Sequence, residues 1–183
     1  MLCALDALVV IDEAYIEFGG ESFVPLIATH PNLVILRTFS KWAGLAGLRV
    51  GYSISAPEVA AAFMAIKQPY NVNVAADVAA QAALAHGGEI FETVRCIIAE
   101  RERMVRDVRA LGWLDPLPSD SNFVLFRVAE GYSAKEVTAA LRAQGVLIRY
   151  YDRPDLANYI RISTGRPEDT DRLVAALRAL EAA

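Results

Sequence analysis

The sequence predicts an α/β fold, in which part of a three-layer α/β/α domain is followed by a small C-terminal α+β domain. Three short apolar runs, rich in β-branched residues, precede two Ala-rich helical segments in the first half of the 183 residues. A long amphipathic pattern comes next, and shorter strands and helices are mixed beyond it. We therefore predict a first domain at 1–88, a connecting helix at 89–112 and a second domain at 113–183.

Three strands are predicted in the first domain, at 7–11, 32–37 and 49–54. The run ALVVI at 7–11 is continuously apolar, so it predicts a strand buried on both faces, as in parallel sheets. Such a strand needs neighbours on both of its edges, yet this one begins close to Met1. We therefore expect a larger sheet, either because the chain is a fragment or because another chain completes it.

Helices are predicted between Pro57 and Pro69, over the Ala-rich segment 74–86, and over 89–111, where apolar residues recur at helical intervals. Glycines follow the second and third of these helices and predict their ends. In the second domain we expect strands at 122–128, 146–151 and 159–163, and helices at 133–144 and from 167 onwards.

The composition excludes several classes of partner. A net charge of −4 and a pI near 5.2 provide no basic surface for nucleic acid or anionic membranes. No apolar run is long enough to span a membrane. Cys3 and Cys96 have neither metal-binding nor redox spacing, so we expect no metal and a cytoplasmic location. A hydrophobic fraction of 55% and a mean hydropathy of +0.30 predict a large core or a covered apolar surface.

Lys41 is one of only three lysines, and it lies in the stretch RTFSKWAGLAGLRVGY at 37–52. A lysine amine that loses its proton can form a Schiff base or act as a general base. The hydroxyls of Thr38 and Ser40 and the guanidinium of Arg49 suit a phosphate group. The residue order is not that of a P-loop, which excludes an ATPase of that type. The alternative is a solvated lysine beside a glycine turn.

Asp12 follows the first predicted strand, at the end where open α/β sheets bind ligands. Its carboxylate could hold a cationic ring nitrogen, and Tyr15 could donate to a second atom of the same ligand. The alternative is that Asp12 caps the following turn and that Tyr15 only packs.

Several stretches resemble the second half of fold type I pyridoxal-phosphate aminotransferases. They are VVIDEAYIEF at 9–18, RTFSKWAGLAGLRVGY at 37–52, KQPYNVN at 67–73 and SNFVLF at 121–126. The stretch VLIRYYDRPDLANYIRISTG at 146–165 resembles the histidinol-phosphate branch of that class more narrowly. The resemblance implies an incomplete copy of the site, because such enzymes carry a long region before the VVIDEAY strand.

The resemblance also implies roles for individual residues toward pyridoxal 5'-phosphate. Lys41 would form the Schiff base with the cofactor aldehyde and would later move a proton at the substrate carbon. Asp12 would pair with the ring nitrogen, and Tyr15 would donate to the phenolic oxygen. The cofactor phosphate would be held by Thr38, Ser40 and Arg49.

Three further residues are implied to bind substrate. Arg161 would bind the α-carboxylate with Asn122 nearby, and Arg149 would meet a distal phosphate. Alternatively, the two arginines pair with Asp152 or Asp155. The implied reaction is transamination between histidinol phosphate and 2-oxoglutarate, giving imidazole acetol phosphate and glutamate in histidine biosynthesis, by a homodimer. The alternatives are an aromatic-amino-acid aminotransferase, a threonine-phosphate decarboxylase, and a non-catalytic remnant.

Overall fold

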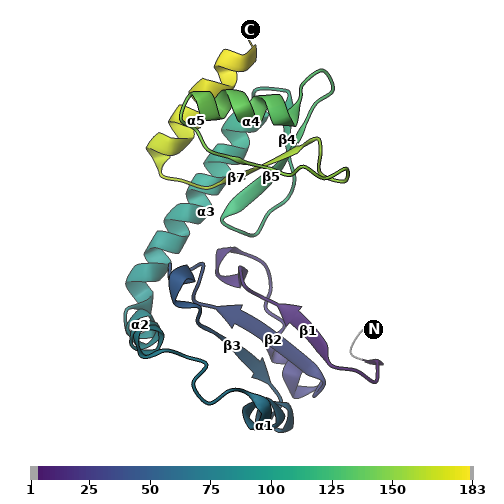
Figure 1. The fold of residues 1–183 in the computed structure, drawn as a ribbon, viewed down its shortest axis with the longest axis vertical. Coiled ribbons are helices and arrows are strands. Elements are labelled where there is room, and N and C mark those ends of the chain that lie inside the picture. The colour runs from purple at the N-terminus through teal and green to yellow at the C-terminus, as the bar shows by residue number, and fades with distance from the viewer. Residues whose placement is uncertain (1–3, 182–183) are drawn as a thin grey trace. The chain divides into compact units, whose positions relative to one another are not determined.

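The computed structural model describes residues 4–181, which form two compact units (Figure 1). The first unit extends to Val94 and the second begins at Arg95, so the boundary falls inside a single long helix, α3 (Gly87–Arg109). Cys3 lies outside the described residues, and Cys96 is an exposed free thiol. Between residues 4 and 181, no helix is both long and apolar enough to cross a membrane.

A three-stranded mixed sheet, sheet A, forms the centre of the first unit (Figure 1). Its strands are β1 (Val9–Asp12), β2 (Leu33–Thr38) and β3 (Gly51–Ser55), in that order. β1 is parallel to β2, whereas β3 is antiparallel to it. Short 3-10 helices occupy the connections at Ile16–Phe18, Val24–Ala28 and Ala46–Leu48.

The strand predicted at 7–11 forms, but the prediction that it is buried on both faces is wrong. Within the described chain β1 pairs only with β2, so it is an edge strand. The side chain of Val10 is 54% exposed, whereas Leu33 and Ile35 of β2 are fully buried. An apolar run indicates that burial is favourable, but a second layer of structure must be present to provide it.

Two helices of the first unit begin at residues that stabilise helix starts. α1 (Pro57–Ile66) has proline in its first turn, where the missing N–H group has no intrahelical acceptor to lose. α2 (Val74–Ala85) is capped by Asn73, whose side chain accepts a hydrogen bond from the Ala76 N–H at 2.8 Å. α3 begins at Gly87, two residues before the predicted start, because the chain re-enters helix directly after His86.

The second unit contains a four-stranded antiparallel sheet, sheet B, with the order β4-β5-β7-β6. The strands are β4 (Leu114–Pro116), β5 (Phe123–Val128), β6 (Arg149–Tyr150) and β7 (Tyr159–Ser163), and the helices are α4 (Ala134–Ala143) and α5 (Pro167–Glu181). Of the strand predicted at 146–151, only the two residues of β6 have strand structure. β4 was not predicted, because its apolar run is short and because Pro116 and Pro118 argue against a strand at this position.

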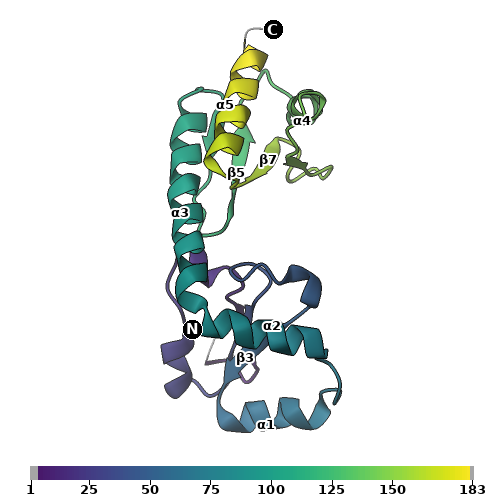
Figure 2. The ribbon, with the colours of Figure 1, turned by 90° about the vertical axis from the view of Figure 1, so that its left-hand side faces the viewer.

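One face of sheet B builds the core of the second unit. Alternate residues of the central strands, such as Val124, Phe126 and Ile160, are fully buried against Leu141 of α4 and Leu177 of α5. Figure 2 shows α5 beside the end of α3. The period-two alternation of β5 and β7 thus places their apolar side chains on the helix-covered face.

Candidate active site

Three strand ends meet at one edge of sheet A. β1 and β2 are parallel, so their C-terminal residues Asp12 and Thr38 lie at the same edge. β3 runs antiparallel, and its first residue, Gly51, is the register partner of Thr38. Arg49, two residues earlier, therefore lies at this edge as well. Open α/β sheets bind ligands beyond the carboxyl ends of their strands, so the edge is the candidate site.

The pleat of the sheet separates two kinds of polar residue at this edge. Asp12 of β1 is the register partner of Leu36 of β2, so their side chains point to the same face of the sheet. Thr38 follows Leu36 by two residues and therefore lies on that face as well. Glu13 and Arg37 lie on the other. The exposed Asp12 carboxylate accepts a hydrogen bond from the Ala14 N–H at 2.9 Å, which orients it at the strand end.

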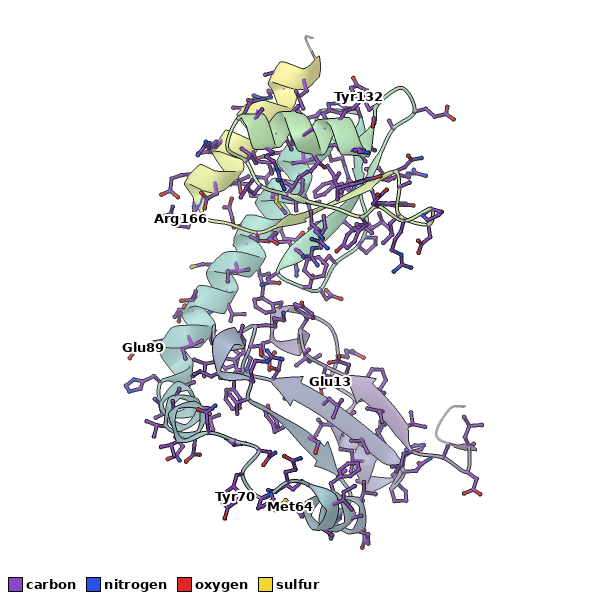
Figure 3. The ribbon with its side chains drawn as sticks, viewed as in Figure 1. Glu13, Met64, Tyr70, Glu89, Tyr132 and Arg166 are labelled. Atoms are coloured by element: carbon purple, nitrogen blue, oxygen red, sulfur yellow. The ribbon has the colours of Figure 1, made fainter. Side chains whose placement is uncertain are left out.

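Glu13 is the centre of a buried polar network behind the candidate site (Figure 3). Arg37 donates to its Oε2 from Nε at 3.1 Å and from Nη2 at 2.9 Å. The Phe23 N–H donates to Oε1 at 2.6 Å, and the Ser22 hydroxyl donates as well. Burial raises the pKa of the Glu13 carboxyl, but these hydrogen bonds outweigh burial and hold the pKa below its ordinary value. The network ties β1, β2 and the 19–24 segment together.

The loop that carries Lys41 is anchored on both sides of the lysine. Phe39 and Trp42 are buried, and their rings lie 5.5 Å apart. Trp42 also stacks on Phe91 with ring centroids 5.2 Å apart. Lys41 itself is exposed, and its Nζ lies 5.3 Å from the centroid of the Tyr15 ring. No carboxylate among residues 4–181 forms an ion pair with it, so the amine is positioned without being neutralised.

The predicted phosphate-binding hydroxyls are held close together. The Thr38 hydroxyl donates to Ser40 Oγ at 2.8 Å and accepts from the Ser40 N–H at 3.0 Å. Arg49 has φ 56° and ψ 43°, and within the described range it is the one non-glycine residue with positive φ. Its guanidinium donates to the Ala46 carbonyl at 2.9 Å. Glycine adopts this left-handed backbone conformation without strain, whereas other residues are strained in it. A non-glycine residue held in such a conformation is typical of a functional position.

Arg49 offers a test that separates its backbone from its side chain. We expect Arg49→Gly to be about 1 kcal/mol more stable than Arg49→Ala, because only glycine removes the left-handed strain. Urea denaturation followed by circular dichroism measures the difference. Both variants lose the guanidinium, so both should bind pyridoxal phosphate equally weakly. Equal stabilities would show that the backbone at this position is not strained.

The predicted substrate residues Arg149, Arg161 and Asn122 lie in the second unit. The alternative prediction, that the arginines pair with Asp152 or Asp155, is wrong for Asp155, because Arg153 binds it at 2.8 Å. Asp152 also forms no ion pair with either arginine. The backbone carbonyl of Asn122 accepts from the Thr164 N–H at 2.9 Å, which joins the start of β5 to the end of β7.

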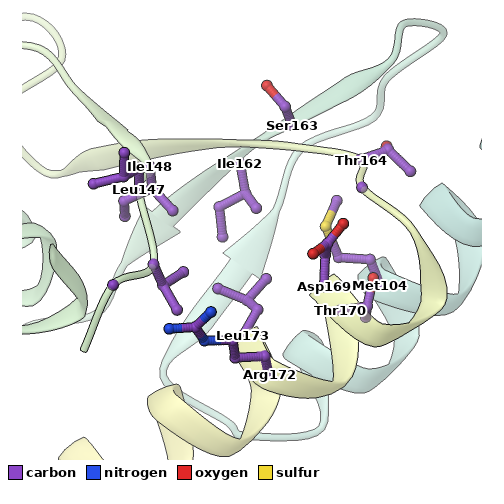
Figure 4. A pocket seen from close by; sticks show the side chains of 13 residues that line it. Met104, Leu147, Ile148, Ile162, Ser163, Thr164, Asp169, Thr170, Arg172 and Leu173 are labelled. Carbon is purple, nitrogen blue, oxygen red and sulfur yellow. The ribbon is translucent and has the colours of Figure 1, made fainter.

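A separate cavity of about 280 Å³ lies in the second unit, between residues 145–148, the end of β7 and α5 (Figure 4). Its wall contains Ile162, Thr164, Asp169 and Arg172, and none of the residues predicted for the site.

Across residues 4–181, no three His, Cys, Asp or Glu side chains are grouped so that they could hold a metal ion.

Sequence reasoning missed Glu13 and Arg37. A signal was available, because each adjoins a predicted site residue at the end of a strand. Period-two alternation puts such neighbours on the opposite face, where an acid and a base can pair. The missing information was the parallel register that brings the two strand ends together.

This end of sheet A thus presents an amine, a carboxylate, a phenol and hydroxyls at the place where open α/β sheets bind ligands. A family model described as aminotransferase class I and II matches residues 2–177. The histidinol-phosphate aminotransferase of Dehalococcoides mccartyi (strain ATCC BAA-2266 / KCTC 15142 / 195) is 49% identical over 168 residues, which are 92% of this chain and 47% of that protein.

Solved structures agree with the sequence relatives. Histidinol-phosphate aminotransferase from Sinorhizobium meliloti, in complex with pyridoxal-5'-phosphate, matches with a TM-score of 0.79 and 36% identity over 94% of this chain and 49% of that one. The L-threonine-O-3-phosphate decarboxylase from Porphyromonas gingivalis matches with a TM-score of 0.83 and 27% identity, over 97% of this chain and 56% of that one.

The chain belongs to the aminotransferase class I and II family. Its fold is that of the fold type I members, which confirms the predicted α/β class and the resemblance stated from the motifs. The chain spans about half the length of the curated relatives it matches.

Proposed function

We propose that this chain carries the cofactor lysine and the substrate arginines of a histidinol-phosphate aminotransferase. The observation that supports this most directly is the edge of sheet A, where Lys41 lies over Tyr15 beside the ends of β1 and β2. The whole reaction would move the amino group of histidinol phosphate to 2-oxoglutarate, giving imidazole acetol phosphate and glutamate.

The residues at this edge have the chemistry that pyridoxal 5'-phosphate needs. When bound, the cofactor supplies an electron sink for negative charge at the substrate carbon. Lys41 would provide the amine that binds the cofactor aldehyde, and its Nζ would afterwards hold and move the proton. The Asp12 carboxylate would keep the ring nitrogen protonated, and Tyr15 would donate to the phenolic oxygen. The hydroxyls of Thr38 and Ser40 would bind the phosphate with Arg49.

Substrate binding is assigned to the second unit. Arg161 would bind the α-carboxylate of glutamate with Asn122 close by, and Arg149 would bind the phosphate of histidinol phosphate. A permanently charged guanidinium with a planar set of donors suits both oxyanions. In this proposal 1–88 is part of the cofactor-binding domain, 89–112 is the connecting helix and 113–183 is the small domain.

The proposed enzyme acts in the cytoplasm as a homodimer. The dimer is supported by apolar side chains that are unusually exposed in α1 and in the connection from α1 to α2, among them Met64 and Tyr70 (Figure 3). Ile66 is 80% exposed and Tyr70 is 94% exposed. An apolar surface of this kind is typical of an interface.

A phosphothreonine decarboxylase is the second candidate, because a decarboxylase of that kind matches the fold at 27% identity. Its substrate also carries a phosphate and an amine, so the same residues would serve it. The two functions differ in product, because a decarboxylase releases CO₂ and transamination forms glutamate.

The cofactor assignment is tested by site-selective labelling. We expect the purified chain to absorb in the visible range after addition of pyridoxal phosphate, and borohydride to fix a pyridoxyl group on Lys41. Peptide mass mapping compares Lys41 with Lys67 and Lys135, the remaining lysines of the chain. Lys41→Arg keeps the charge and should remove the label, because a guanidinium does not release its proton near neutral pH. Equal labelling of the three lysines would contradict the assignment.

A further inference from the structure

Sheet B has a second face that is not part of the core of the second unit. Along β5 and β7 the alternate residues Phe123, Leu125 and Arg161 are only partly buried, whereas their neighbours in sequence are buried against the helices. Arg149 of β6 belongs to the same face, because it is the register partner of Arg161. This face therefore carries two arginines beside aromatic and aliphatic side chains.

The two arginines form an unusual pair. Residues directly opposite each other on adjacent antiparallel strands have neighbouring side chains, and like charges in that position repel. Two other arginines near this sheet are paired with carboxylates: Arg127 with Asp115 at 2.9 Å and Arg153 with Asp155. Neither Arg149 nor Arg161 has such a partner between residues 4 and 181. Two adjacent cations without counter-charges are typical of an anion-binding site.

The ring of Tyr151 lies beside both guanidiniums. The guanidinium carbon of Arg149 is 5.5 Å from the ring centroid, and that of Arg161 is 5.9 Å from it. Arg161 also lies 4.7 Å from the centroid of the Phe123 ring. The Nε atom of Arg161 is buried and has no hydrogen-bond partner. Aromatic rings, rather than carboxylates, surround these two charges.

This difference matters chemically. A carboxylate beside a guanidinium would occupy its N–H donors and cancel its charge. An aromatic ring attracts a cation through the negative potential of its π face, without accepting hydrogen bonds from the guanidinium donors. The exposed N–H donors of each arginine then stay available for an oxyanion. The ring also reduces the mobility of two long side chains, so that less freedom is lost when an anion binds.

We propose that Tyr151 is a positioning residue that holds Arg149 and Arg161 ready to bind a phosphate-bearing substrate. This rests on the proposed function, which assigns both arginines to substrate anions. The ring, rather than the hydroxyl, performs the role, because the ring supplies both contacts. Tyr151 thereby favours a doubly charged phosphate group at Arg149, beside the second positive charge of Arg161, over a single carboxylate.

The test compares Tyr151→Phe with Tyr151→Leu in the full chain, with inorganic phosphate and acetate as probes in calorimetric titrations. Tyr151→Phe keeps the ring and should bind phosphate within about twofold of the wild type. Tyr151→Leu keeps apolar bulk, and its phosphate affinity should fall about tenfold. Its preference for phosphate over acetate should fall as well. A loss of fold would reduce all binding together and would appear in the thermal unfolding midpoint.

A spectroscopic measurement supports the titrations. In arginine-labelled protein, the Nε–H signals of Arg149 and Arg161 should carry a ring-current shift that Tyr151→Phe retains and Tyr151→Leu loses. Unchanged phosphate affinity in Tyr151→Leu would overturn the proposal, and so would equal losses in both variants. If Tyr151→Leu left the affinity unchanged, Arg149→Ala would still reduce phosphate binding provided that the substrate assignment is right. Absence of phosphate binding by the wild type would overturn both the role of Tyr151 and the assignment of the two arginines to substrate. Labelling of Lys41 in the first unit would still test the cofactor assignment separately.

Discussion

Replacing Glu13 by alanine is expected to lower the free energy of unfolding by about 3 kcal/mol. The change leaves the Arg37 guanidinium without its carboxylate and removes the acceptor of the Phe23 N–H. Removing one partner of a buried ion pair is strongly destabilising, because the other charge stays desolvated. We choose the lower end of the usual range because the side chain of Arg37 is 21% exposed. Urea denaturation followed by circular dichroism measures the loss.

A matched control is available within the same network. Ser22→Ala removes one hydroxyl that donates to Glu13 and should lower the free energy of unfolding by about 1 kcal/mol. A double variant, in which apolar residues of similar volume replace both Glu13 and Arg37, should recover much of the lost free energy of unfolding, since no unpaired charge is left. If Glu13→Ala were no less stable than Ser22→Ala, the ion pair would not be what holds the strand ends together.

The same network makes the stability of the folded protein depend on pH in the acidic range. The pKa of folded Glu13 lies below its ordinary value of about 4.5, so the ionised carboxylate stabilises the folded state. This contribution is complete above the unfolded pKa and is lost as the pH falls through the folded pKa. Glu13→Gln cannot titrate and should show a weaker loss of stability below pH 4.5 than the wild type. Parallel curves for the two proteins would contradict this assignment.

Arg149→Ala is expected to weaken binding of histidinol phosphate roughly 10- to 100-fold, as judged from the worth of a charged hydrogen bond. Binding of phenylalanine should change little, because that ligand has no phosphate for Arg149 to contact. Calorimetric titration of the chain measures both affinities. Arg127→Ala is the matched control, because Arg127 lies on the same face of sheet B but is paired with Asp115.

The outcome separates the candidate functions. Equal losses for both ligands would contradict a phosphate-specific role of Arg149. Little loss for either ligand would favour an aromatic-amino-acid aminotransferase. A loss for histidinol phosphate alone fits either phosphate-binding enzyme, and the decarboxylase is then identified by CO₂ release from phosphothreonine.

Much of the fold could be predicted because its signals are local. The alternation in FVLFRV predicts β5 and also which of its side chains face the helices. Asn73 and Ser133 cap helices through their own side chains, within a few residues of the backbone groups they bind. The chemical types in the 37–52 stretch were equally local, and they indicated an amine beside phosphate donors.

Non-local pairing decided the rest. The sequence by itself determined which residues could do chemistry and the order in which the strands and helices follow. It did not determine that Glu13 meets Arg37, that Arg49 takes a left-handed backbone, or that Arg153 rather than Arg149 binds Asp155. These features depend on strand register and loop closure, which join residues far apart in the chain. The burial of β1 was mispredicted for the same reason, since exposure depends on which layers cover a strand.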